Sequence, residues 1–401
     1  MTENREFRDE FKRVFYFILS EFKVHGKFIT PFNMISIPIM ITAVVIIVIR
    51  FTYGLGAVTN LSQDFSWGLW KGLNVVTGVA FAGGAYVITF AVYVMGVKKY
   101  EPIVRVTVLN GFLAYIFYAG ALILELGRPW NIFNPLIGNS FGYNSVLFLV
   151  AWHFLLYIIA QFLEFSPVVA EWLGLERLRK ILKSLTLGAV IFGITLSMLH
   201  QSGLGALFLL AKSKIHPLWY SEFMPILFLI SSVPAGLSMV ILEGYLSAKV
   251  FADKMSAGER KNHDDIIIGL SKGASISLFV YYFFKAIIFI HGKQWDLLFG
   301  FWGVLYLAEV YLFALLPCIL FAQGSKFRNT GLIRIAAIMT ALGIILNRLN
   351  VSLIAFNWNS AAHYFPTWME IVVSMAVLMA EVWIFRWIAL RMPVFESRRE
   401  V

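Results

Sequence analysis

Hydrophobic residues occur along this chain in long runs that are separated by short polar segments. Each run is about 20 residues long, the length that an α-helix needs to cross the hydrocarbon core of a membrane. Ten runs are present, near residues 31–53, 67–95, 103–124, 143–163, 185–204, 223–246, 267–290, 297–320, 332–350 and 368–390. The pattern predicts an all-α integral membrane protein with about ten transmembrane helices, called spans 1 to 10 below.

The N-terminal segment, residues 1–30, differs from these runs. Its stretch FKRVFYFILSEFK alternates bulky apolar and charged residues at roughly helical spacing. It lacks the short apolar core and the small-residue cleavage site of a secretory signal peptide. We therefore expect an amphipathic helix on the membrane surface, followed by a ten-helix transmembrane domain over residues 31–392 and a short tail at residues 393–401.

Composition supports a membrane protein and limits its chemistry. Hydrophobic residues make up 59% of the 401 positions and charged residues only 14%, which leaves too little polar surface for a soluble domain. Cys318 is the only cysteine, so this chain alone cannot build a disulfide, a thiolate zinc site or an iron–sulfur cluster. The net charge of +10 lies on no soluble basic domain, so we expect no nucleic-acid partner.

Basic residues are concentrated in alternate connections between the spans. The connections 2–3, 4–5, 6–7 and 8–9, together with both termini, hold most of them, whereas the opposite connections hold chiefly Arg128, Lys212, Lys214 and Lys293. Basic loops of membrane proteins stay in the cytoplasm. Both termini are therefore expected in the cytoplasm, and spans 3, 5, 7 and 9 are expected to end at the outer face.

Polar and ionisable side chains gather near the outer ends of four spans. In span 2 they follow one helical stripe, span 3 ends in LELGRPW, span 5 carries HQ, and span 9 ends in LNRLN. Ionisable groups at membrane depth are costly and usually functional, although polar side chains can also simply bond neighbouring helices together. The candidate site residues are Trp67, Lys71, Asn74, Glu125, Arg128, Trp130, His200, Gln201, Asn347 and Arg348.

A faint internal repeat relates the two halves of the chain. GRPW and GKQW close spans 3 and 7, LHQ and LNR lie near the ends of spans 5 and 9, and AGG and AGL lie in spans 2 and 6. Chance resemblance among Gly, Trp and Leu is the alternative. The repeat predicts two four-helix halves in parallel orientation, spans 2–5 and spans 6–9, with a site near their interface.

A thinner set of ionisable residues is expected in the other half of the membrane. It comprises His153 in span 4, Glu243 in span 6, Glu309 in span 8 and Glu381 in span 10. Carboxylates and histidines inside a helix bundle are candidates for a proton relay. Each one is explained equally well as a neutral, hydrogen-bonded structural group.

A quinone suits the outer group of residues. Its head group needs a flat apolar slot, hydrogen-bond donors at two carbonyl oxygens and titratable groups that exchange two protons. The tryptophans can supply the slot, the lysine, arginine and amide side chains can donate, and Glu125 and His200 can exchange protons.

Two other functions remain as alternatives. A b-type cytochrome holds its haem between histidines on facing helices. Only His153 and His200 lie within the spans, and we expect them at different depths; two haems are therefore excluded and one is disfavoured. A secondary transporter would suit the repeat and the buried charges, but transporter sites favour broken helices, and these spans are expected to be mostly uninterrupted.

Several long motifs resemble one known family. They are GLWKGLNVVTGVAFAGGAY, LELGRPWNIFNP, TLSMLHQSGLGALFLLAKSKIHPLWYS and NRLNVSLIAFNW. They are similar to the HybB-type membrane subunit of uptake hydrogenase-2 complexes and to its relative in the high-molecular-weight cytochrome (Hmc) complexes of sulfate reducers. Both belong to the broader NrfD-like (NrfD/PsrC, polysulfide-reductase-type) membrane subunits. The resemblance covers about residues 67–358.

This resemblance implies a quinone- or quinol-reactive anchor of a respiratory oxidoreductase complex in a bacterial or archaeal inner membrane. It implies two four-helix bundles flanked by the first and last spans, and menaquinone or ubiquinone as the cofactor, with no haem or iron–sulfur cluster in this chain. The implied partners are a periplasmic ferredoxin-like iron–sulfur subunit and a hydrogenase or a multihaem cytochrome c. Glu125, Arg128, Trp130, His200 and Gln201 occupy the family's motif positions, although many relatives have Asp where Glu125 stands.

Overall fold

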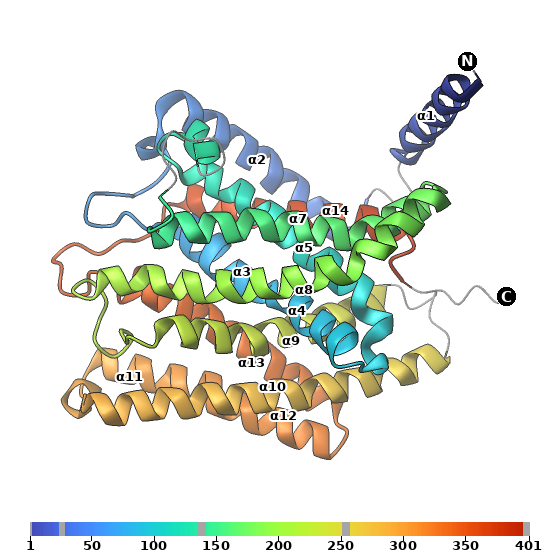
Figure 1. Ribbon diagram of the computed structural model, residues 1–401. Helices are drawn as coiled ribbons and strands as arrows, with labels where there is room; N and C mark the ends of the chain where they lie inside the picture. Colours follow the sequence, from blue (N-terminus) through green and yellow to red (C-terminus); the bar gives the residue numbers. More distant parts are fainter. Residues whose placement is uncertain (1, 24–28, 135–141, 251–256, 396–401) are drawn as a thin grey trace.

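The computed structural model describes residues 2–23, 29–134, 142–250 and 257–395. It is helical throughout (Figure 1), and the described ranges contain one isolated β-bridge, between Ile215 and Phe356. The predicted all-α class is confirmed. Most of the predicted tail, residues 396–401, lies outside the described residues.

Ten segments of the described chain are long and apolar enough to cross a membrane, as predicted. Where the bounds differ from prediction, the helices are mostly longer, because charged residues continue them past the apolar run. The segments are α2 (Pro31–Tyr53), Trp70–Val94, α5 (Glu101–Glu125), α7 (Val146–Trp172), α8 (Glu176–Leu207), α9 (Met224–Val250), α10 (Ala257–Gly292), Phe301–Lys326, Thr330–Ile354 and α14 (Trp368–Arg391).

Three spans contain π-helical stretches. Span 2 consists of η2 (Trp70–Thr77), α3 (Gly78–Phe81), α4 (Gly83–Thr89) and η3 (Phe90–Val94), of which η2 and η3 are π-helices. Span 8 consists of α11 (Phe301–Leu307), the π-helix η9 (Ala308–Leu315) and α12 (Leu316–Lys326), and span 9 consists of α13 (Thr330–Leu349) and the π-helix η10 (Asn350–Ile354). These three spans are continuous, but parts of them depart from regular α-helix. π-Turns are frequent at functional sites.

The helices form the two predicted bundles (Figure 1). Span 2, α5, α7 and α8 pack together, and α9, α10, α12 and α13 pack together. The first and last spans, α2 and α14, pack against each other, and α14 also packs on α5. The flanking pair therefore lies beside the first bundle.

The two bundles approach each other closely where span 2 crosses α9. A Cβ atom on Gly236 would lie 2.0 Å from the backbone nitrogen of Gly84, and one on Gly83 would lie 2.8 Å from the carbonyl oxygen of Ser232. Such close backbone contact requires residues without side chains. The contacting glycines belong to the AGG and AGL motifs, so the two copies of this repeated motif touch each other.

The connections lie at two ends of the molecule. The end where α5 stops, called the Glu125 end here (left in Figure 1), also holds the residues between α8 and α9 and those before α14. The opposite end, called the terminal end, holds both chain termini and α1 (Thr2–Glu21). Helix α1 lies apart from the bundles, with its Phe17 ring 5.1 Å from that of Trp172. The amphipathic helix exists; its contact with a membrane surface stays a prediction.

Candidate functional site

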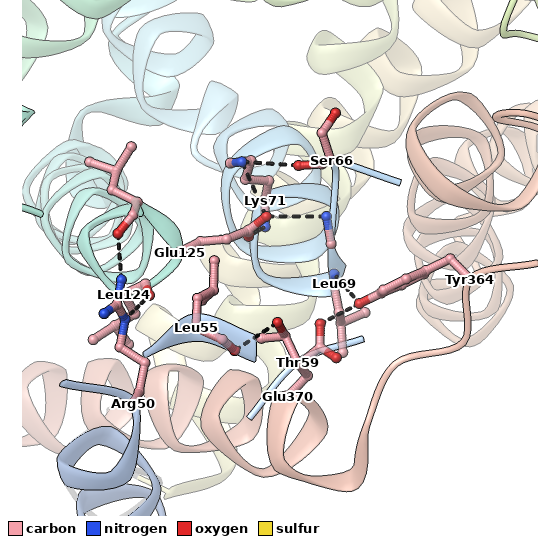
Figure 2. Close-up of polar contacts among 12 residues, drawn as sticks. Arg50, Leu55, Thr59, Ser66, Leu69, Lys71, Leu124, Glu125, Tyr364 and Glu370 are labelled. Atoms are coloured by element: carbon pink, nitrogen blue, oxygen red, sulfur yellow. Dashed lines mark hydrogen bonds and ion pairs between the residues drawn. The ribbon is translucent and has the colours of Figure 1, made fainter. Parts of the chain in front are cut away.

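Glu125 is the last residue of α5, and its side chain is buried. The carboxylate accepts hydrogen bonds from the backbone N–H groups of Gly68 at 3.1 Å and Lys71 at 2.6 Å, and the Lys71 Nζ lies 3.3 Å from Oε1 (Figure 2). The first N–H groups of a helix have no partner within it and attract anions. The start of span 2 therefore binds this carboxylate with two amides and one ammonium group.

Arg50, in the last turn of α2, holds the backbone on both sides of Glu125. Its side chain is buried, its Nε donates to the carbonyl oxygen of Leu124 at 2.6 Å, and its Nη2 donates to that of Leu126 (Figure 2). These carbonyls belong to the end of α5, where backbone acceptors lack partners within the helix. The only sequence signal for Arg50 was a single cation at the end of an apolar run.

A second carboxylate, Glu370, reaches the same region from the first turn of α14. It forms a capping box with Thr367, and the hydroxyl of Tyr364 donates a hydrogen bond to its Oε1 (Figure 2). A Cβ atom on Gly68 would lie 3.3 Å from Oε1 of Glu370 and 3.3 Å from Oε1 of Glu125, so both acids border this glycine. Tyr364 lies in the connection between span 9 and α14. Burial and the bond to Glu370 raise its pKa, so its hydroxyl keeps its proton.

A second cluster lies deeper in the first bundle. Asn74 on η2, Tyr115 on α5, and His200 and Gln201 on α8 are each at most 1% exposed. Gln201 donates to the carbonyl oxygen of Val79 at 2.8 Å. Within the described residues, both amide atoms of Asn74, the Tyr115 hydroxyl, the His200 Nε2 and the Gln201 Oε1 have no hydrogen-bond partner. Buried polar atoms normally have partners, so these side chains can bind water or the polar atoms of a ligand.

His153 lies closer to this cluster than predicted. The His200 Nδ1 is 3.2 Å from the carbonyl oxygen of Val150, three residues before His153 on α7, which places the two histidines within about one helical turn of each other. The prediction of different depths is wrong. The rings of Tyr115 and Phe154 pack against His200 at centroid distances of 5.7 and 5.2 Å, so aromatic side chains border this imidazole and the haem alternative is not favoured.

A third cluster lies in the second bundle around Glu309. Its Oε1 accepts from Asn347 at 2.7 Å, and its Oε2 accepts from Trp219 and Asn350 at 2.7 Å each. The Nζ of the buried Lys285 lies 3.6 Å from Oε1. Glu309 therefore lies with residues expected at the outer site, rather than in the separate inner set where the sequence placed it.

Arg348 belongs to this third cluster as well. It donates to Ser231 at 2.8 Å, and its guanidinium lies 3.5 Å over the centre of the Phe228 ring. The rings of Phe228 and Phe208 are 5.7 Å apart, and those of Phe208 and Trp67 are 4.9 Å apart. Trp67 is thus packed on Phe208 at the junction between the bundles.

Arg128 and Trp130 lie on the surface of the Glu125 end. Both are exposed, Trp130 by 72%; Arg128 precedes the short 3-10 helix η5 (Pro129–Phe133), and Trp130 is its second residue. The ten candidate residues therefore do not form one constellation. Glu125 with Lys71 forms one cluster, His200 and Gln201 with Tyr115 a second, and Asn347 with Arg348 a third; Asn74 lies on span 2 between Lys71 and Val79, whose carbonyl Gln201 binds.

A large cavity lies at the terminal end, away from these three clusters. It has a volume of about 1150 Å³ and lies between α5, α9, α10, the turn from α7 to α8 and the end of α14. Glu243 lines it, and Asn110 donates a hydrogen bond to Glu243. A small void continues inward from this pair to Tyr118 and Glu381.

Sequence reasoning missed several polar and charged residues of these clusters. Lys285 and Glu370 were hidden in stretches that otherwise look like ordinary helix, and the capping pattern Thr-x-x-Glu is typical of any helix start. Within the described ranges, no group of three or more His, Cys, Asp or Glu side chains is placed to hold a metal ion. The missed residues are Arg50, Lys285, Tyr364 and Glu370.

Several known proteins are similar to this chain over most of its length. A protein of Nitratidesulfovibrio vulgaris is 43% identical over 367 residues, which cover 91% of this chain and 94% of the relative. The probable Ni/Fe-hydrogenase 2 b-type cytochrome subunit of Escherichia coli is 32% identical, with 89% and 90% covered. The integral membrane subunit of menaquinone reductase of N. vulgaris is 24% identical, with 87% of each chain covered.

The family model described as "Polysulphide reductase, NrfD" matches residues 57–357. This range begins just before span 2 and ends after span 9, so it covers both four-helix bundles and leaves out the flanking spans. The match therefore includes all three polar clusters except Arg50 and the residues around Glu370. The chain belongs to the NrfD family of polysulphide reductase membrane proteins.

Proposed function

We propose that this chain is the quinone- or quinol-reactive membrane subunit of a respiratory oxidoreductase complex. One observation carries the proposal. The ion pair of the buried Glu125 and the partly exposed Lys71 lies at the start of span 2, and Asn74, three residues further along the same span, has buried amide atoms without a partner in the described chain. A proton-exchanging acid, a cation and free hydrogen-bonding groups thus lie in close succession, as a quinone head group requires.

The side chains of the first bundle fit a quinone head group chemically. Asn74 and Lys71 would donate hydrogen bonds to its carbonyl oxygens, and Glu125 would exchange protons with it. His200 and Gln201 would provide further polar atoms deeper in the bundle, and Arg128 and Trp130 would border the site from its surface. Asn347 and Arg348 lie in the second bundle, where they form hydrogen bonds with Glu309, Ser231 and the Phe228 carbonyl. In this proposal their role is structural.

Electrons would reach or leave the quinone through another polypeptide. With a single cysteine, this chain has no thiolate cluster of its own. One relative is named as a hydrogenase subunit and another as a menaquinone reductase subunit. We therefore propose a ferredoxin-like iron–sulfur subunit docked at the Glu125 end, a hydrogenase or multihaem cytochrome c as its electron donor, and menaquinone or ubiquinone as the substrate.

The distribution of basic residues supports one orientation in the membrane. The terminal end carries most of the Lys and Arg residues of the connections, and such loops face the cytoplasm. In this proposal the terminal end faces the cytoplasm of a bacterial inner membrane, and the Glu125 end and its partner subunit face the periplasm.

The cavity at the terminal end suggests where protons for the quinone come from. It reaches Glu243 and Asn110, and the void beyond them reaches Tyr118 and Glu381. The ring of Tyr118 lies against span 2, because a Cβ atom on Gly78 would lie 2.5 Å from it. In the proposed route, Glu243 and Glu381 carry protons toward span 2, while His153 belongs to the His200 cluster and Glu309 to the second bundle.

Replacing the acid of the ion pair tests the proposed site. We expect Glu125→Gln to lower quinone turnover about 10²-fold or more, because general acid–base groups contribute about 10²- to 10⁴-fold, and Glu125→Asp to retain much more activity. Turnover is measured in membranes that contain the whole complex, as the reduction of a short-chain quinone analogue by the complex's electron donor. Glu222→Gln, an exposed acid before α9, is the matched control. Normal turnover of Glu125→Gln would place the site elsewhere.

A further inference from the structure

The first and last spans lie outside both four-helix bundles, but residues in or next to them form hydrogen bonds with the segments around Glu125. From α2, Arg50 binds the carbonyls of Leu124 and Leu126. From the segment that leads into α14, the hydroxyl of Tyr364 accepts a hydrogen bond from the backbone N–H of Leu69 at 3.0 Å (Figure 2). Arg50 of the first span thus binds the end of α5, and Tyr364, just before the last span, binds the start of span 2.

Arg50 is unusual among the residues of α2. The other buried side chains of this helix are small, apolar or uncharged, whereas Arg50 is only 4% exposed and carries a charge. Burying a cation in a membrane helix is costly, so a cation in this place normally has a task. The bond from its Nε at 2.6 Å is short and joins residues 74 positions apart in the chain.

We propose that Arg50 is a positioning residue for Glu125, an inference that rests on the proposed function. Glu125 is the last helical residue of α5, and the terminal turn of a helix is its least constrained part. Arg50 binds the peptide groups of the two neighbouring residues, so it fixes the backbone from which the Glu125 side chain extends. The carboxylate is thereby held against the amides of Gly68 and Lys71.

The shape of the guanidinium explains why an arginine is needed. Its planar group has donors that point in fixed, separate directions, and Arg50 uses two of them on two carbonyl oxygens. A lysine ammonium is a point charge on a flexible stem. It would bind one of the two carbonyls well, and the peptide on the other side of Glu125 would be free to turn.

A purely structural role makes a different prediction from a positioning role. If Arg50 only capped α5, its loss would lower the stability and the amount of the assembled complex. Turnover would then fall by the same factor whether or not position 125 carries an acid. If Arg50 acts through Glu125, its loss slows turnover only while Glu125 is present. A double-mutant cycle separates these two cases.

The test compares Arg50→Gln, Arg50→Lys, Glu125→Gln and the double variant Arg50→Gln/Glu125→Gln, in membranes that contain the whole complex. A misplacement of about 1 Å can cost about 10²-fold in rate. We therefore expect Arg50→Gln to lower kcat roughly 10- to 100-fold with KM for the quinone analogue nearly unchanged. Arg50→Lys, the conservative variant, is expected to assemble and to give an intermediate kcat. In the Glu125→Gln background the further loss should be less than about twofold.

Arg386→Gln is the matched control. Like Arg50, Arg386 joins two spans, in this case the last to the first, through a bond to Asn33 at 3.3 Å. It has no contact with Glu125 among the described interactions, so the kcat of Arg386→Gln should stay at the wild-type value. An unchanged kcat in Arg50→Gln, or an equal loss in both backgrounds, overturns the inference while the quinone site stands. Normal turnover of Glu125→Gln overturns the proposed site and this inference together.

Discussion

His216 lies among three tryptophan rings in the connection between α8 and α9. The rings of Trp219, Trp302 and Trp358 are 5.6, 5.3 and 4.6 Å from its own, and its Nδ1 accepts a hydrogen bond from the backbone N–H of Leu218. Burial lowers the pKa of His216 to about 4. The folded protein therefore keeps this histidine neutral in mildly acidic solution, whereas the unfolded chain protonates it near its usual pKa of about 6.5.

This difference predicts a loss of stability in acid. As the pH falls from about 6.5 to about 4, the unfolded state gains a proton that the folded state does not bind, so the free energy of unfolding decreases. His216→Asn keeps an acceptor for the Leu218 N–H but cannot titrate. We expect its thermal midpoint in detergent to fall less between pH 7 and pH 4.5 than that of the wild type. The exposed His363→Asn is the control; equal slopes for wild type and His216→Asn would contradict the prediction.

At the scale of single residues, the sequence predicted the members of the polar clusters better than their grouping. Glu125, Lys71, His200 and Asn347 are conspicuous because charge and amide groups are rare in apolar runs. Their partners could not be predicted, because hydrogen bonds such as that from Gly68 to Glu125 join segments 57 residues apart. A backbone donor leaves no mark in a sequence.

At the scale of helices, the hydrophobic pattern located all ten spans, because a bilayer requires long apolar segments. It could not locate the π-helical stretches. A π-turn shifts the register by a single residue and keeps the apolar composition, so η2 and η9 look like ordinary helix in the sequence. The regular stripe expected in span 2, with Trp67, Lys71 and Asn74, therefore holds only in part.

The crossing of span 2 with α9 gives a prediction for these elements. We expect Gly236→Ala to destabilise the protein by about 1 to 3 kcal/mol or more, because its Cβ atom would meet backbone atoms of Gly84 that cannot move aside. Gly120→Ala, on α5, is the control: its Cβ atom would meet no atom within 4 Å, and alanine favours helix over glycine by about 1 kcal/mol. Thermal midpoints and yields in detergent report both effects. A wild-type midpoint for Gly236→Ala would show that the bundles can separate there without cost.

At the scale of the whole molecule, the proposed proton route connects the cavity at the terminal end with the Glu125 end. We expect Glu243→Gln and Glu381→Gln each to slow turnover roughly 10- to 100-fold and to reduce proton uptake from the side of the terminal end. Uptake is measured with a pH-sensitive dye in sealed vesicles. Glu101→Gln, an exposed acid at the same end, should behave as wild type. Undiminished proton uptake per quinone reduced in both variants would rule out this route.

The division into two bundles was predictable from the faint repeat, whereas their mode of contact was not. Four-residue similarities such as GRPW and GKQW show which spans correspond, and the tryptophan of each motif belongs to a short 3-10 helix, η5 or η8 (Trp295–Leu298). Which faces meet depends on the shape of whole helices. The sequence signal was only that small residues recur at corresponding places in spans 2 and 6.

The contact between the AGG and AGL motifs has a consequence for the origin of this architecture. A surface patch that meets its own counterpart is the isologous interface by which identical subunits form symmetric dimers. A protein consisting of a single four-helix half could pair with a second copy through the same glycines. Joining both copies in one polypeptide would make that pairing permanent, and it would leave each copy free to diverge, one toward the Glu125 cluster and the other toward the Glu309 cluster.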